Sequence, residues 1–169
     1  MRIFPSALAA LVVLACSACA PDGLAFRADK RLTILAPEDE AEVSLPLTIR
    51  WQMKDFDVVE PGTPVREGAG YFAVFVDQTP PSPGENVRTL AKGDLSCDPA
   101  AGCPDAKYLA ERDVYVTTDT ELVLTELPER TGRAASRHKA TIILLDGKGT
   151  RIGESSFKVD FEVRQGAQS

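Results

Sequence analysis

The chain has 169 residues, 19 basic and 25 acidic side chains, a formal net charge of −6 and four cysteines. Because an acidic chain repels phosphate backbones and anionic lipid headgroups, the charge argues against nucleic-acid binding and against electrostatic adsorption to membranes. The length suits one domain with a real hydrophobic core, and we place that domain at residues 31–164.

The first 15 residues have the order of a secretory signal peptide. Arg2 precedes an apolar run from Ile3 to Ala15, and small residues follow. A transmembrane helix is the alternative, but a bilayer span needs about 20 apolar residues, and polar residues interrupt this run at Ser17 and Asp22. We therefore predict an exported protein.

The end of this run, Val12-Val13-Leu14-Ala15-Cys16, resembles the bacterial lipobox. The resemblance implies that Cys16 is acylated, for example with palmitate, and becomes the N-terminus of a lipoprotein. Cys19 is the alternative, although Cys16 then stands where the pattern has an aliphatic residue, and an ordinary signal peptide cleaved nearby is another.

Neither Ser17 after Cys16 nor Ala20 after Cys19 is the aspartate that resembles an inner-membrane retention signal. We expect a lipid anchor in the outer membrane, on its periplasmic or surface side, if the cell has two membranes. In a cell with one membrane, the expected place is the outer face of the cytoplasmic membrane. The lipid is the only membrane contact we expect.

Residues 16–30 are predicted to be a lipidated tether, and strand signals begin after it. Leu32–Ala36 is a short apolar run ended by Pro37, which predicts an edge strand. From Leu45 to Lys54, apolar and polar residues alternate, as in a half-buried antiparallel strand. The Pro- and Gly-rich stretch from Asp55 to Gly70 predicts a loop.

The middle of the chain contains one strong strand signal. Tyr71–Val76 is apolar at every position and predicts a central strand covered on both faces. The proline-rich stretch Thr79–Gly84 cannot join a sheet ladder. Asn86–Ala91 is a weak strand prediction, and Lys107–Arg112 predicts one helical turn.

The last third again shows short strands and a hairpin. The predicted segments are strands at Val114–Thr118, Glu121–Leu127 and His138–Leu145, a charged connection from Glu129 to Arg137, a turn at Asp146–Gly149, an alternating strand at Arg151–Arg164 and a disordered tail at 165–169. About seven strands without crossover helices predict an all-β antiparallel sandwich.

Two cysteines lie far from the processing site. Cys97 and Cys103 flank a Pro- and Gly-containing loop, and an exported protein meets an oxidising compartment, so we predict a disulfide between them. Its main effect would be to stiffen the loop, because so short a ring stabilises the fold only modestly. Two free thiols are the alternative.

The order of residues from Arg31 to Arg164 resembles a fibronectin type III or bacterial Ig-like domain. The resemblance implies an Ig-like sandwich that binds, spaces or braces rather than catalyses. It is carried by Pro37, Trp51, Tyr71–Asp77, Leu122–Pro128 and Asp146-Gly147. The long connection after Pro128, the inserted cysteine loop and His138, where the family tends to have tyrosine, depart from it.

The sequence contains no coherent catalytic set, so we expect a non-enzymatic protein without a cofactor. His138 is the only histidine, and we predict a partly buried residue that hydrogen-bonds a neighbouring loop; a copper ligand, with Met53 or the tether supplying others, is the alternative. Oxygen ligands for calcium could come from two acidic stretches, although a solvated surface explains them better: Asp55, Asp57 and Glu60, and Glu38, Asp39, Glu40 and Glu42.

Function is therefore predicted at the level of a class. We expect an interaction or structural module of the cell envelope that binds a protein or a glycan. A small-ligand or metal-binding protein is the alternative. Any interaction surface should lie near Pro81, Pro83, Tyr71, Tyr108 and Tyr115, although prolines can also simply protect a sheet edge.

Overall fold

The computed structural model describes residues 29–128 and 136–164. The predictions for the signal peptide, Cys16, Cys19, most of the charged connection and the tail at 165–169 fall outside these residues. Among the described residues, no helix is long and apolar enough to cross a membrane.

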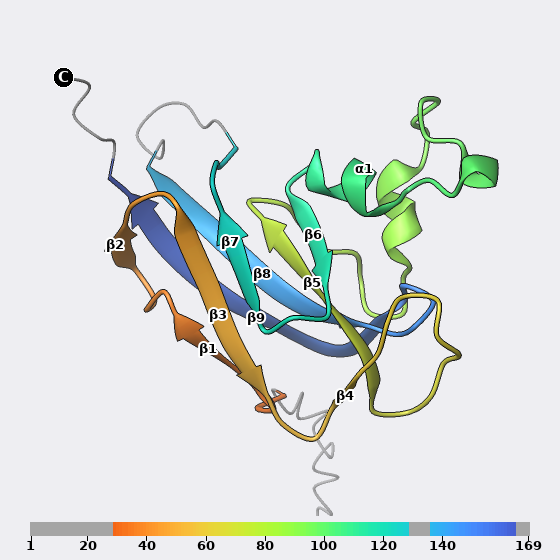
Figure 1. The fold of residues 1–169 in the computed structure, drawn as a ribbon, viewed down its shortest axis with the longest axis horizontal. Helices are drawn as coiled ribbons and strands as arrows, with labels where there is room; N and C mark the ends of the chain where they lie inside the picture. Colours follow the sequence, from red (N-terminus) through yellow and green to blue (C-terminus); the bar gives the residue numbers. More distant parts are fainter. Residues whose placement is uncertain (1–28, 129–135, 165–169) are drawn as a thin grey trace, which may run out of the picture.

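The described chain is all-β, as predicted, and forms two sheets that pack face to face (Figure 1). The smaller sheet has the order β1 (Leu32–Ala36), β3 (Leu47–Met53) and β7 (Glu121–Leu124). The larger sheet contains β2 (Ala41–Val43), β9 (Arg151–Val163), β8 (Arg137–Leu145), β5 (Ala69–Val76) and β4 (Asp57–Val58), with β6 (Val114–Thr117) also paired to β5. Three short helices lie between β5 and β6: η1 (Val87–Ala91), η2 (Pro99–Ala101) and α1 (Ala106–Ala110).

The prediction of purely antiparallel pairing is wrong at two edges. β2 pairs with β9 in parallel, and β4 pairs with β5 in parallel. Both strands are only two or three residues long, so they are too short for an alternating pattern to reveal them. The remaining ladders, including the β8–β9 hairpin, are antiparallel.

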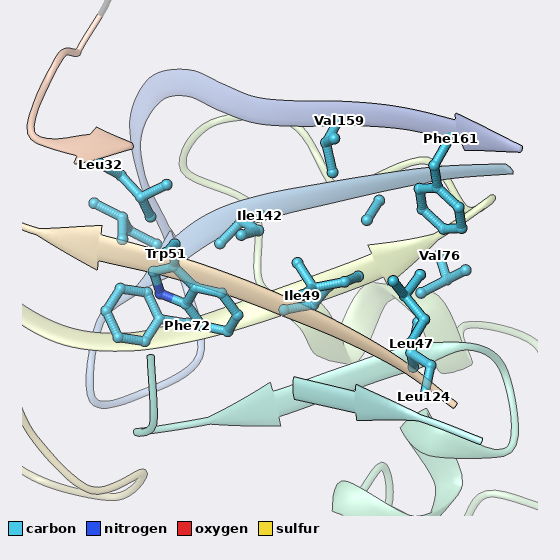
Figure 2. Packing of buried hydrophobic residues seen from close by; sticks show 13 residues of the cluster. Leu32, Leu47, Ile49, Trp51, Phe72, Val76, Leu124, Ile142, Val159 and Phe161 are labelled. Carbon is cyan, nitrogen blue, oxygen red and sulfur yellow. The ribbon is translucent and has the colours of Figure 1, made fainter. Parts of the chain in front are cut away.

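Alternating apolar residues form the core between the sheets. In β3, Leu47, Ile49 and Trp51 are buried and the residues between them are exposed, which is the period of a strand with one face in the core. Figure 2 shows these side chains meeting Phe72 of β5 and the inner faces of β8 and β9. The Trp51 and Phe72 rings meet edge to face at a centroid distance of 5.4 Å.

The central strand β5 is buried on both faces, as its sequence predicted. Phe72 and Val74 face the core between the sheets, whereas Tyr71 and Phe75 belong to a second apolar cluster on the opposite face. Residues 77–113, here called the insert, supply the other half of this second cluster, including Val87 and Leu109. The insert is thus a third layer over the outer face of the larger sheet.

One predicted element of the insert has a different structure. The weak strand expected at Asn86–Ala91 is the 3-10 helix η1, because the Asn86 side chain accepts a hydrogen bond from the Arg88 amide at 3.0 Å and caps it. The helical turn expected at Lys107–Arg112 is confirmed as α1, which begins at Ala106 after the Asp105 cap.

Candidate functional site

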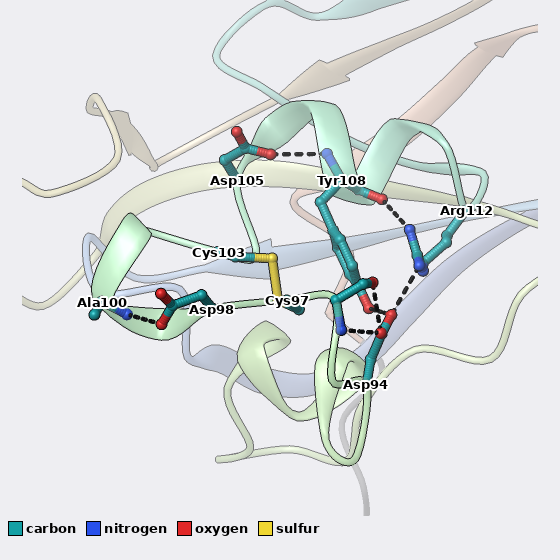
Figure 3. The surroundings of a disulfide bond; sticks show 9 residues. Asp94, Cys97, Asp98, Ala100, Cys103, Asp105, Tyr108 and Arg112 are labelled. Atoms are coloured by element: carbon teal, nitrogen blue, oxygen red, sulfur yellow. Dashed lines mark hydrogen bonds and ion pairs between the residues drawn. A yellow bond between two sulfur atoms is a disulfide. The ribbon is translucent and has the colours of Figure 1, made fainter.

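The predicted disulfide is present and links Cys97 to Cys103 inside the insert (Figure 3). Cys97 is buried within the second cluster beside Tyr108 and Leu109. The disulfide loop is therefore joined at its base to the sheet and does not simply project from an edge. The turn just before Cys97 carries Leu95, which is fully exposed.

A polar cluster around Asp94 holds the segment that presents Leu95. The Asp94 carboxylate accepts hydrogen bonds from the Ser96 hydroxyl at 2.6 Å, the Tyr108 hydroxyl at 2.7 Å and the Arg112 guanidinium at 2.9 Å, while the Ser96 amide donates a fourth. The Arg112 guanidinium also lies 3.6 Å from the centre of the Tyr108 ring (Figure 3). Leu95 thus stands between the anchored residues Asp94 and Cys97.

This cluster changes the acidity of its members. The hydrogen bond from the Ser96 hydroxyl, followed by that from Tyr108, holds the pKa of Asp94 far below its ordinary value. The same bond to Asp94 raises the pKa of Tyr108. Asp94 therefore stays ionised and Tyr108 stays a donor over the whole neutral range.

Beside the disulfide loop lies a pocket of about 530 Å³. Such a volume accommodates a small organic ligand. Four loop and helix segments supply most of its walls: residues 61–62 after β4, η1 with its cap Asn86, the start of α1, and the β8–β9 turn. Tyr71 of β5 and Val116 of β6 complete the lining on the side of the sheet. The turn itself, predicted from sequence, is confirmed: Asp146 accepts hydrogen bonds from the amides of Lys148 and Thr150 at 2.8 and 2.9 Å.

Asn86 joins η1 to this turn. Its side-chain amide donates to the Lys148 carbonyl at 2.8 Å and to the Thr150 hydroxyl at 3.3 Å. Gly149 has a φ of 83°, a conformation that glycine adopts without strain. Two walls of the pocket are therefore fixed to each other by side-chain hydrogen bonds.

Tyr71 of β5 contributes the phenol at the sheet side of the pocket. The residue is only 5% exposed, and its hydroxyl lies 3.2 Å from the point where a side chain on Gly149 would begin. Within residues 29–128 and 136–164, this hydroxyl has no hydrogen-bond partner. Burial, and secondly the charge of Asp146, raise the pKa of Tyr71, so the phenol is protonated and available as a donor.

No family model, curated protein or solved structure matches this chain.

His138 is buried and hydrogen-bonds a neighbouring loop, as predicted. Its Nδ1 lies 2.7 Å from Oδ2 of Asp77, the residue that follows β5, and its ring stacks on Phe161 at 5.9 Å. Met53 ends β3, and Figure 1 shows β3 ending toward the bottom of the fold, whereas β8 begins at its upper left. The described residues contain no group of three His, Cys, Asp or Glu side chains arranged to hold a metal ion.

Three carboxylates of the two acidic stretches engage neighbours within the fold. Asp57 pairs with Arg66, and Glu42 pairs with Arg164 at 2.9 Å. The Asp39 carboxylate accepts a hydrogen bond from the backbone amide of residue 160 at 3.0 Å. These contacts account for several of the carboxylates weighed as calcium ligands.

The five predicted interaction residues have different surroundings. Pro83 is exposed, whereas Pro81 is buried and its carbonyl accepts a hydrogen bond from Arg151 at 2.7 Å. Tyr71 and Tyr108 are buried as described above, and Tyr115 lines a shallow groove between β6 and β7. The sequence analysis did not single out Leu95, Asn86, Arg88, Lys148 or Gly149 as site residues. Only Asn86 and Gly149 have a local signal, because Asn and Gly are typical turn residues.

Proposed function

We propose that this chain is a lipid-anchored protein of the bacterial cell envelope and that its β domain is a non-enzymatic interaction module. The lipobox-like residues that end at Cys16 support the anchor. The insert, with its braced loop and its pocket, is the binding region of the module.

The strand order supports an Ig-like or fibronectin type III-like frame. One sheet joins β1, β3 and β7, and the other places β9, β8 and β5 side by side, in the manner of the two sheets of an Ig-like domain. In such frames, binding residues commonly lie on loops that a rigid scaffold positions. The insert between β5 and β6 is the longest segment of this kind among the described residues.

The observation that carries the proposal is the presentation of Leu95. A leucine that is fully exposed gains nothing from the fold of its own domain, and its removal from water by a partner is favourable. The disulfide and the four hydrogen bonds on Asp94 order the loop before binding. Ordering in advance lowers the entropic cost of association.

The test is photo-crosslinking in the native cell, with a photoreactive residue placed at Leu95 in the full-length chain. The matched control places it at Leu35, an exposed leucine on β1 of the other sheet. We expect a discrete envelope partner captured from position 95 and absent from position 35. Equal capture from both positions, or capture from neither, would overturn the assignment of the insert as the binding region.

A small-ligand-binding protein is the second candidate, and the 530 Å³ pocket beside the loop favours it. Melting of the purified protein against a panel of small solutes separates the two functions, since a ligand that binds the folded state raises the melting temperature. A solute that raises the melting temperature, together with an empty crosslink, would favour this second function.

A further inference from the structure

Two basic side chains line the pocket and form no ion pair with other described residues. Arg88 projects from η1, and Lys148 projects from the β8–β9 turn. In the part of the chain that the structure describes, neither side chain makes an ion pair or a hydrogen bond. Other arginines do pair: Arg112 with Asp94 and Arg164 with Glu42. The pocket lining thus carries two cations, Arg88 and Lys148, against one carboxylate, Asp105, on a chain whose net charge is −6.

One carboxylate, that of Asp105, lines the pocket, and a second, that of Asp146, lies behind the β8–β9 turn; both accept hydrogen bonds from backbone amides. Asp105 accepts a hydrogen bond from the Tyr108 amide at 2.8 Å as the cap of α1. Asp146, behind the turn, accepts from the amides of Lys148 and Thr150. Hydrogen bonds from backbone amides stabilise a carboxylate in place, so neither group is free to turn toward Arg88 or Lys148.

The second, independent observation is the Tyr71 hydroxyl. Tyr71 is only 5% exposed as a residue, and its hydroxyl has no hydrogen-bond partner among the described residues. The hydroxyl itself is not fully buried, because the residue lines the pocket, and an acceptor can reach it from there. Because residue 149 is glycine, no side chain fills the space in front of this hydroxyl; a Cβ at residue 149 would stand 3.2 Å from the hydroxyl oxygen. An acceptor that enters the pocket would complete this bond.

We propose that the pocket binds the carboxylate of a small organic acid or of a peptide C-terminus. The Tyr71 hydroxyl donates to the carboxylate, and Arg88 and Lys148 flank it. The apolar part of the ligand packs on Val87 and Leu109, which also line the pocket. The inference deepens the proposed interaction role and rests on it, since it names the chemical group that the insert recognises.

The test measures binding by NMR, using the amide signals of the full-length protein in detergent micelles. The probes are 4-methylpentanoate and its uncharged amide, 4-methylpentanamide, which differ only in the carboxylate. For a ligand of this size we expect a dissociation constant on the order of 1 mM for the acid. The amide should bind at least about tenfold more weakly. The affected signals should be those of η1 and the β8–β9 turn.

Three variants locate the site. The double variant Arg88→Gln/Lys148→Gln should lose the preference for the acid, and Tyr71→Phe should weaken acid binding several-fold while keeping the ring in the core. Lys92→Gln is the matched control, because Lys92 is an exposed cation at the other end of η1. It should bind the acid as the unmodified protein does.

Equal binding of acid and amide, an unchanged double variant, or no shift of the pocket signals would overturn the proposal. An acetylated dipeptide that ends in a free leucine carboxylate distinguishes the two sources of the group: tighter binding than 4-methylpentanoate assigns a peptide C-terminus, and equal binding assigns a small acid. Crosslinking from position 95 is read separately, so a failed titration with a preserved crosslink rejects this site and leaves the interaction role intact.

Discussion

Replacement of Trp51 tests how the main core is built. Trp51 is 1% exposed and packs edge to face on Phe72, so Trp51→Ala removes a large buried ring and leaves a cavity. Such truncations cost about 3–5 kcal/mol, which is a large part of the roughly 5–15 kcal/mol that a domain has in total. We therefore expect Trp51→Ala to unfold at a much lower urea concentration, with the same slope of the free energy of unfolding against urea concentration.

A second replacement at this position separates volume from polarity. The indole Nε1 of Trp51 is buried and has no hydrogen-bond partner among the described residues. Trp51→Phe removes that donor and keeps one ring, so relief of the unpaired group, about 1–3 kcal/mol, offsets part of the lost packing. The expected loss for phenylalanine is less than half of the loss for alanine.

The assay is equilibrium urea unfolding of the full-length protein, followed by far-ultraviolet circular dichroism. Fluorescence cannot compare the variants, because Trp51 is the only tryptophan in the chain. An alanine variant that loses less than about 1 kcal/mol would show that this ring does not fill the core. A phenylalanine variant as unstable as the alanine variant would show that the indole N–H has an acceptor, such as a buried water.

Three further predictions concern the insert and the hairpin. Asp94→Asn should destabilise the protein at neutral pH. Because folding lowers the pKa of Asp94, the ionised carboxylate stabilises the fold at pH values above its pKa in the unfolded chain, and this stabilisation disappears as the pH falls below about 4. A difference in melting temperature between the variant and the unmodified protein that does not shrink in acid would refute this. Arg151 is buried, donates a hydrogen bond to the carbonyl of Pro81 and has an unpaired Nε. Arg151→Met should therefore lower the free energy of unfolding in urea by about 1–3 kcal/mol. A more stable variant would mean that the cost of desolvating the guanidinium exceeds the stabilisation from its hydrogen bonds. A Cβ on Gly147 would stand 2.0 Å from the Thr63 carbonyl oxygen, so Gly147→Ala should lower the stability by about 1–3 kcal/mol. Lys148→Ala, at the exposed neighbouring residue, is the control and should change the stability little. Equal melting temperatures of the two variants would show that the 59–66 loop does not pack against Gly147.

The strands that sequence predicts best are those whose burial repeats along the chain. β3 alternates buried and exposed residues, and β5 is buried throughout, so period and composition alone indicate one covered face or two. The β8–β9 turn is predicted by its Asp-Gly sequence and is held by Asp146. These features depend on neighbours within a few residues.

The pocket could not be predicted in this way, because its walls meet only in the folded chain. Residues 61–62, Tyr71, the η1 helix and the β8–β9 turn are far apart in sequence, and each looks like an ordinary loop or strand. The sequence predicted Tyr71 as part of a strand covered on both faces and as a residue near a possible interaction surface, but not which segment covers it. Its burial follows from the insert covering the outer face of β5, a tertiary contact that carries no local signal.

The second apolar cluster explains how an inserted segment can serve as a precise binding region. Phe75 and Ile143 of the larger sheet are completely buried, although they face away from the core between the sheets, and the insert supplies the residues that cover them. Removing the insert would expose this face to water, so its ordering is coupled to the stability of the whole domain. A loop that is attached only at a sheet edge and covers no apolar face lacks this coupling, and it can change conformation without unfolding of the domain. The fold therefore positions both Leu95 and the pocket walls through one additional apolar layer, whose burial also stabilises the domain.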